Sequence, residues 1–108
     1  MALISEEQGV LTLINVFTVE PKNQQPLVDL LVEATETTMS RQPGYVSANI
    51  HKSLDGTTVA NYAQWRSRED FEAMFRNPDA RAHMDEAGRL AVSFEPQLYE
   101  VAFSDGGS

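Results

Sequence analysis

The chain has 108 residues, with 16 acidic and 8 basic side chains, a net charge of −8 and no cysteine. This length suits one domain with a single modest core, which we assign to residues 1–108 with its folded part at about 10–103. The lack of thiols excludes disulfides, thiolate metal sites and cysteine nucleophiles, and the acidity disfavours a nucleic-acid partner. No apolar run reaches transmembrane length, so we expect a soluble, cytoplasmic protein that does not bind membranes.

The first expected element is a strand over residues 10–19. Residues 1–8 lack a clear period, and we expect them to fray. Both faces of the strand are largely apolar, which predicts an interior strand that is covered on both sides. Alternation assigns one of these faces to Leu11, Leu13, Asn15, Phe17 and Val19.

A helix and a hairpin follow. Glu20 and Pro21 end the first strand, residues 23–25 open an amphipathic helix, and residues 42–44 end it. A second strand over residues 45–53 alternates. We expect Val46, Ala48 and Ile50 on one face, opposite Tyr45, Ser47, Asn49 and His51. The following Asp-Gly pair predicts a tight turn, so residues 58–66 form a third, antiparallel strand.

One face of that third strand combines polar and apolar groups. Alternation places Asn61 and Trp65 on the same face as Val59 and Ala63. A buried side-chain amide without a hydrogen-bond partner costs about 1–3 kcal/mol. Either the protein therefore supplies a partner for Asn61, or the surface is built for a ligand that does.

The remaining pattern completes the fold. Ser67 is the expected N-cap of a helix with an apolar stripe. Residues 77–79 interrupt this helix, and a helix resumes over residues 80–90. Residues 92–103 contain a last strand, which we expect to be disturbed at Glu95 and Pro96. We expect residues 104–108 to be a flexible tail. The order βαββαβ predicts an α+β, ferredoxin-like plait with two helices on one face of an antiparallel sheet. Covering the other face would take a second copy, so we expect a homodimer that forms a dimeric α/β barrel.

Several segments of the chain resemble one family. Residues 12–19 resemble the first strand of the nogalamycin-pathway anthrone oxygenase. Residues 44–48, 55–57 and 61–65, with His51, closely match the hairpin of the actinorhodin-pathway monooxygenase. Over roughly residues 10–103 the chain is thus similar to the antibiotic biosynthesis monooxygenase family. The likeness is greatest to its cofactor-independent members, which oxidise aromatic polyketide anthrones or phenols to quinones.

The resemblance implies a set of site residues. The positions that match the family's pocket asparagines and tryptophan are Asn15, Asn61 and Trp65, which become the candidate catalytic residues. Two positions depart from the actinorhodin-pathway enzyme. Phe71 stands where that enzyme has a tyrosine, and Asp85 falls near its pocket arginine, which argues against carrying over a proton relay.

The residues suit oxygen chemistry without a cofactor or a metal. An anthrone that loses its acidic benzylic proton becomes an electron-rich anion, which can give one electron to dioxygen. The protein would bind a flat aromatic substrate and hold O2 beside it. Beside Trp65, the candidate substrate-binding residues are Phe17, Phe71, Met74 and Phe75. Asn15 and Asn61 would donate to the oxygen that gains charge, each donor being worth about 2.7–4 kcal/mol in a dry site.

Other interpretations stay open at this point. Haem-degrading monooxygenases share the fold, and Asn15 and His83 fall near the positions of their strand asparagine and proximal histidine, although Met74 stands near their tryptophan. A non-catalytic ligand-binding barrel and a polyketide cyclase are further alternatives. For His51 we expect a solvated or dimer-interface position, and for His83 an exposed helical one.

Overall fold

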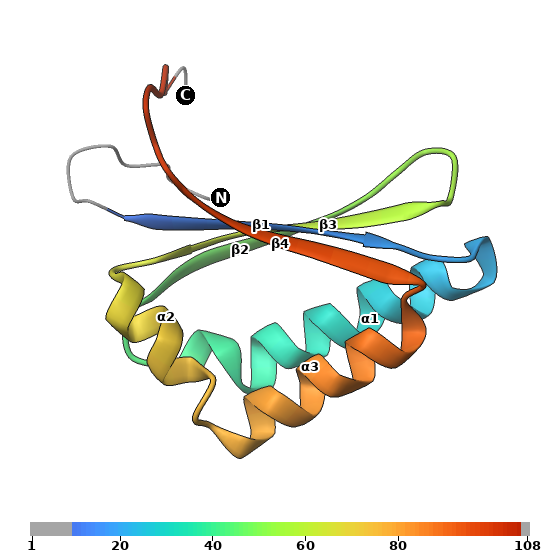
Figure 1. Cartoon of the computed structure of the whole chain (residues 1–108), viewed down its shortest axis with the longest axis horizontal. Coiled ribbons are helices and arrows are strands. Elements are labelled where there is room, and N and C mark those ends of the chain that lie inside the picture. The colour runs from blue at the N-terminus through green and yellow to red at the C-terminus, as the bar shows by residue number, and fades with distance from the viewer. Residues whose placement is uncertain (1–9, 107–108) are drawn as a thin grey trace.

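The computed structural model describes residues 10–106, so the predicted fraying of residues 1–8 and the end of the predicted tail lie outside it. It contains one antiparallel sheet with strand order β2-β3-β1-β4. The strands are β1 (Leu11–Thr18), β2 (Tyr45–Lys52), β3 (Thr58–Trp65) and β4 (Ser93–Glu100). The helices α1 (Pro21–Thr37), α2 (Arg68–Met74) and α3 (Pro78–Leu90) all lie on one face of this sheet (Figure 1). The predicted ferredoxin-like fold is confirmed, and its second helical segment is divided into α2 and α3 near the interruption that was predicted at residues 77–79.

The bounds of α1 differ from the prediction at both ends. The helix begins at Pro21, ahead of the expected residues 23–25, because proline fits the first turn, where its missing N–H would be unpaired anyway. It ends at Thr37, and a 3₁₀ turn over Met39–Arg41 carries the chain to the predicted break. The last turn therefore tightens where one continuous helix was expected.

A β-bulge near the start of β2 corrects the predicted alternation. Tyr45 pairs with Trp65, but the next register pair is Ser47 with Gln64, so Val46 is the extra residue. The bulge puts Tyr45 on the same face as Ala48, whereas strict alternation had assigned it to the opposite face. Val46 is 43% exposed as a result.

The last strand continues through the proline that was expected to disturb it. Pro96 lies opposite Asn15 in an unbroken register between β1 and β4. A proline is tolerated there because β4 is an edge strand, so no strand on its outer side requires a backbone N–H donor at this position.

Side-chain caps begin the two helices that follow β3. Ser67 Oγ accepts from the backbone N–H of Asp70 at 3.1 Å, as predicted. Asn77 Oδ1 accepts from the backbone N–H groups of Asp79 and Ala80, so α3 begins at Pro78 and not at residue 80. In residues 10–106, none of the helices is long and apolar enough to cross a membrane.

The core between sheet and helices is divided into two clusters. The first is centred on Phe17, Leu27 and Val59, and the second on Trp65, Phe71 and Met74. Both clusters contribute residues to the walls of one cavity. Side chains therefore do not completely fill the space between the sheet and the helices.

Candidate active site

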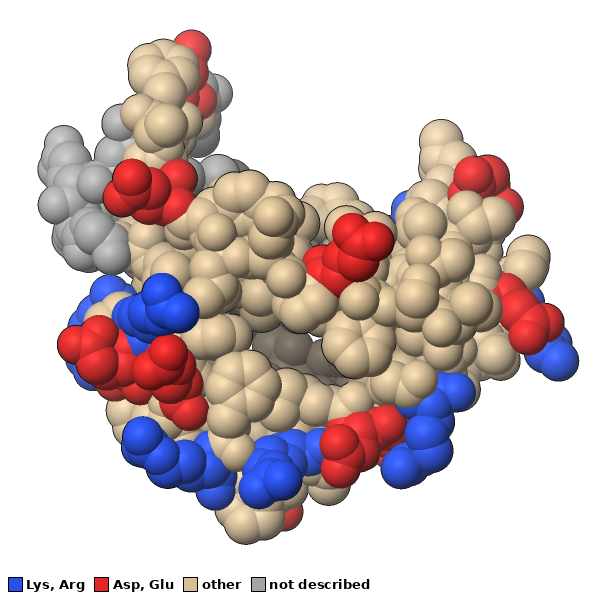
Figure 2. Space-filling view, in the orientation of Figure 1, with Lys and Arg blue, Asp and Glu red and all other residues tan. Residues whose placement is uncertain are grey.

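A cavity of about 650 Å³ lies between the helix-covered face of the sheet and the helices. Its volume falls within the range of roughly 300–1,000 Å³ that is typical of small-molecule sites. Figure 2 shows a hollow on the viewed face, bordered mainly by residues without charge. All seven candidate site residues line the cavity: Asn15, Phe17, Asn61, Trp65, Phe71, Met74 and Phe75.

The two asparagines form a pair at the floor of the cavity. Asn15 of β1 lies directly opposite Asn61 of β3 in the antiparallel register. Their side chains share a face, and residues paired in this way have Cβ atoms about 4.5–5.5 Å apart. The sheet thus brings together two amides that are 46 positions apart in the sequence.

Neither amide is satisfied by the protein. The Oδ1 atoms of Asn15 and Asn61 are buried and have no hydrogen-bond partner among the residues that the structure describes. Within the same range, their amide nitrogens donate no hydrogen bond. An unpaired buried polar group costs about 1–3 kcal/mol. Ser47 Oγ and Gln64 Oε1 are also buried without a partner in this range, but neither residue lines the cavity, so only the two asparagines are within reach of a bound ligand.

Trp65 lies at one end of β3, on the same face of the sheet as the two asparagines. It lies four residues beyond Asn61 on β3, about 13 Å along a strand that rises roughly 3.3 Å per residue. The indole is 3% exposed and packs edge-on against Tyr45 at 5.8 Å and Phe71 at 6.2 Å between ring centroids. Trp65 is therefore both a core residue and a wall of the cavity, with its orientation fixed by two neighbouring rings.

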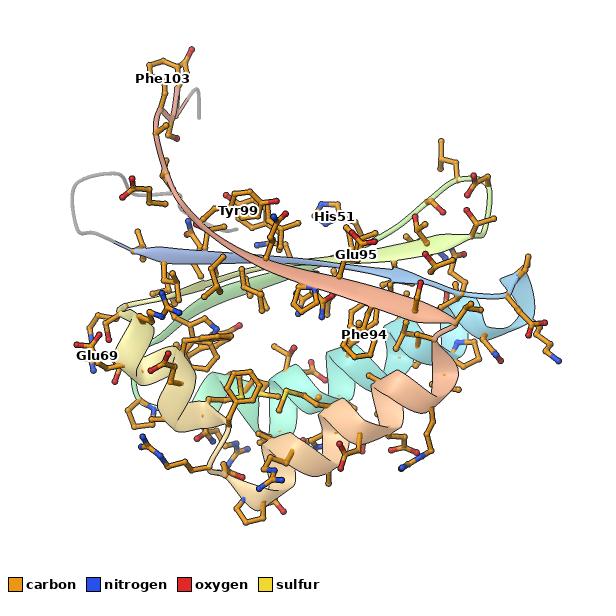
Figure 3. All side chains as sticks on the ribbon, in the orientation of Figure 1. His51, Glu69, Phe94, Glu95, Tyr99 and Phe103 are labelled. Atoms are coloured by element: carbon orange, nitrogen blue, oxygen red, sulfur yellow. The ribbon has the colours of Figure 1, made fainter. Side chains whose placement is uncertain are left out.

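Aromatic side chains also line the more exposed part of the cavity wall. Phe75 is 41% exposed and packs edge-on against Phe71 at 5.0 Å. Phe94 of β4 is 52% exposed and points toward the helices (Figure 3). The centroids of the Phe94 and Phe17 rings are 6.0 Å apart. Our sequence interpretation missed Phe94. Phe94 is the register partner of Phe17 across β1 and β4, so its place at the cavity follows from the strand pairing and not from the sequence of either strand alone.

Four titratable side chains line the cavity. Tyr45 projects from β2, and burial raises the pKa of its hydroxyl above the usual value of 10.0. Arg81, His83 and Asp85 come from α3. His83 is half-buried in the cavity wall, which corrects the expectation of an exposed helical histidine. Tyr45, Arg81 and His83 line the cavity but were not among the site residues proposed for the oxygenase from the sequence.

The other histidine lies away from the cavity. His51 is exposed on β2, and Figure 3 shows it on the side of the sheet opposite to the helices. Across residues 10–106, no group of three or more histidine, aspartate or glutamate side chains is placed to hold a metal ion.

Comparison with known proteins gives this geometry a context. Residues 10–86 match the antibiotic biosynthesis monooxygenase family. The chain is 44% identical over its whole length to a tetracenomycin-F1 monooxygenase of Streptomyces glaucescens, of which it covers 96%.

Two solved structures share the architecture. A monooxygenase from the ActVA-Orf6 gene of Streptomyces coelicolor, in complex with nanaomycin D, superimposes with a TM-score of 0.82 at 25% identity, over 91% of this chain and 92% of that one. An asparagine-to-alanine variant of SnoaB, a cofactor-independent oxygenase from Streptomyces nogalater, gives a TM-score of 0.79 at 20% identity, over 89% and 96% of the two chains.

Proposed function

Because this chain belongs to the antibiotic biosynthesis monooxygenase family and is an oxygenase, we propose that it oxidises an aromatic polyketide-type anthrone or phenol to a quinone with O2 and without a bound cofactor. The relative from Streptomyces glaucescens, which shares 44% of its residues with this chain, supports a polycyclic aromatic substrate. The cofactor-independent oxygenase with the same fold supports the cofactor-free route.

The observation that carries the proposal is the unpaired amide pair. Asn15 and Asn61 lie opposite each other, without protein partners, on the wall of a largely apolar cavity. Each amide group offers two N–H donors. Donors held in place in a dry cavity stabilise an oxygen that gains negative charge, by roughly 2.7–4 kcal/mol for one donor. The aromatic walls supply the flat, apolar surface that a polycycle needs.

Atoms and electrons balance in the proposed reaction with O2 as the oxidant, so the reaction requires no redox cofactor. Loss of a benzylic proton leaves an enolate-type anion, whose oxygen the amides bind. The anion gives one electron to O2, and the resulting radical and superoxide combine to form a carbon–oxygen bond and a peroxide anion. The peroxide takes up a proton. Loss of the second benzylic proton then breaks the O–O bond, which leaves a carbonyl group and releases water. One anthrone and one O2 give one quinone and one water.

The test is turnover by metal-stripped protein. Dithranol serves as the anthrone, and both quinone absorbance and O2 uptake are followed. The proposal expects one O2 consumed for each quinone formed, at a rate well above the buffer control. Binding of dithranol without O2 uptake would favour a ligand-binding protein and contradict the proposal.

We also propose that the protein works as a homodimer. The sheet face opposite the helices carries Val16 and Tyr99, which are 40% and 43% exposed, next to the half-buried Ile14 and Tyr62. Figure 3 shows Tyr99 on that side of the sheet. A second sheet packed on this face would bury these groups. Sedimentation equilibrium would show a dimer mass, and Val16→Glu should shift the population toward monomer.

A further inference from the structure

The proposed reaction begins with loss of a proton, and the cavity offers few groups that can take one. Among residues 10–106, four titratable side chains line it, namely Tyr45, Arg81, His83 and Asp85. Burial raises the pKa of Tyr45, so its hydroxyl keeps its proton near neutral pH. An arginine stays protonated at any working pH and cannot accept a proton. Only the imidazole and the Asp85 carboxylate are left.

Position on α3 favours the imidazole. His83 lies three residues after Ala80 and four residues before Ala87, and both alanines are buried. Residues at these spacings share one face of a helix, so His83 belongs to the inward face. The His83 side chain is half-buried, whereas Asp85 is exposed. Imidazole is also the side chain suited to exchanging protons near neutral pH.

The protein leaves the His83 imidazole without a structural task. No hydrogen bond or ion pair of this side chain is found with any residue in 10–106. A histidine kept for structure usually binds a backbone carbonyl or a carboxylate. His83 is therefore available to a molecule in the cavity.

The location of His83 also matches the shape of the substrate class. In an anthrone, the carbonyl oxygen and the acidic CH2 group lie at opposite ends of the central ring. The amide pair lies in the sheet and His83 lies in a helix that covers it, so the two face the cavity from different layers. An anthrone with its oxygen at Asn15 and Asn61 can thus direct its CH2 group toward α3.

We propose that His83 is the catalytic base that takes the substrate's benzylic proton, an inference that rests on the proposed function. The C–H bond breaks, its electron pair stays on the substrate as the enolate, and the proton moves to the free nitrogen of the imidazole. The imidazolium then returns this proton to the peroxide anion formed after O2 addition. His83 is regenerated in each turnover.

The chain provides a matched control, because it contains only two histidines. His83→Gln is compared with His51→Gln, which changes the exposed histidine on the opposite face of the sheet. Anaerobic stopped-flow mixing with dithranol follows the enolate absorbance before any oxygen chemistry begins. We expect His83→Gln to slow enolate formation about 10²- to 10⁴-fold and His51→Gln to leave it unchanged. Added imidazole should restore part of the rate in His83→Gln only.

The pH dependence supplies a readout that a structural role would not move. In His83→Gln, the rate of enolate formation should rise about tenfold per pH unit, as hydroxide replaces the base. In the parent protein and in Asp85→Asn, it should level off. Enolate formation in His83→Gln at the parental rate would overturn the inference, as would loss of the rate in Asp85→Asn. So would a Soret shift on adding hemin that is lost in His83→Gln, since the imidazole would then be an iron ligand.

A second measurement covers the case in which His83→Gln does not fold. With ¹⁵N-histidine labelling, the parent protein gives two sets of imidazole signals, one for each histidine, which His51→Gln assigns. Anaerobic dithranol should convert the His83 signal to the imidazolium form and leave His51 unchanged, and an unchanged His83 signal would overturn the inference. Failure of the proposed function itself looks different, because the parent protein would then consume no O2 with dithranol.

Discussion

A buried side-chain amide lies on each face of the sheet, and the two environments differ. On the face away from the helices, Gln64 is fully buried and its Nε2 donates to Thr12 Oγ1 at 3.2 Å, from β3 to β1, while its Oε1 has no partner among the described residues. On the helix face, the same two strands bring Asn15 and Asn61 together, and neither amide has a partner among the residues described. Only the second pair adjoins the cavity. Burial of an amide therefore says little by itself, and the space beside it distinguishes a structural amide from a candidate binding group.

Among the changes that compare the two faces of the sheet, removing the cavity amides should have the largest effect on activity. We expect Asn61→Ala and Asn15→Ala each to lower kcat/KM with dithranol by about 10²- to 10³-fold, because each removes a donor to the charged oxygen. Neither variant should lose stability, since each deletes an unpaired buried group. Stopped-flow turnover and thermal unfolding measure the two effects.

The matched control replaces the polar pair on the other face. Thr12→Val combined with Gln64→Leu exchanges both partners for apolar groups, which is often nearly neutral for stability. This variant should keep parental kcat/KM. A loss comparable to that in Asn61→Ala would show that the two faces do not differ in function.

Narrowing the cavity should have the next largest effect. Gly88 of α3 lines the cavity, and a Cβ added there would lie 3.7 Å from Phe94 Cε1, which is ordinary contact. Gly88→Ala should therefore bind dithranol normally and stabilise the helix by up to about 1 kcal/mol. Gly88→Leu should raise KM at least about tenfold, because its extra carbons occupy space the substrate needs. An unchanged KM in Gly88→Leu would show that the substrate does not reach α3.

Trp65 offers a smaller change on the same wall. Trp65→Phe keeps an aromatic ring but shortens the surface between Tyr45 and Phe71. We expect KM to rise about two- to tenfold, in line with roughly 0.5–1.5 kcal/mol for an aromatic contact. A large fall in kcat with unchanged KM would instead indicate that the indole takes part in the electron or proton transfer.

The smallest expected effect concerns Tyr45 and stability at alkaline pH. Burial raises the pKa of this hydroxyl in the folded protein above its unfolded value of 10.0. The folded state therefore holds this proton more tightly, so this stabilisation is complete below pH 10 and is lost as pH rises beyond it. In Tyr45→Phe, the free energy of unfolding should fall less steeply with pH above 10 than in the parent protein. Urea unfolding at a series of pH values measures this, and an equal fall of the free energy of unfolding with pH in both proteins would contradict the prediction.

Much of the fold could be predicted from the sequence because its signals are local. Alternation identified the cavity face of β1 and of β3, and Ser67 and the Asp-Gly turn were read from two or three residues each. Tyr45 was assigned to the wrong face because a bulge is a property of the strand pair and not of one strand.

The site was harder to predict, since its parts meet only through the sheet and the helix layer. The family resemblance indicated Asn15, Asn61 and Trp65, but nothing in the sequence showed that the two amides lack partners. His83 lies in a helix in which charged residues alternate with small or apolar ones, so its inward face became clear only once α3 was packed against the sheet. Which residues share a void depends on packing between elements, and no single segment records it.

The central claim is that the amide pair stabilises the substrate as an anion. It is tested most directly by titrating bound dithranol with pH in the absence of O2 and recording its enolate absorbance. In the parent protein, the bound ligand should ionise about two to three pH units lower than in Asn15→Ala/Asn61→Ala, the equivalent of roughly 2.7–4 kcal/mol. Ionisation at the same pH in both proteins, with dithranol bound in each, would contradict the account.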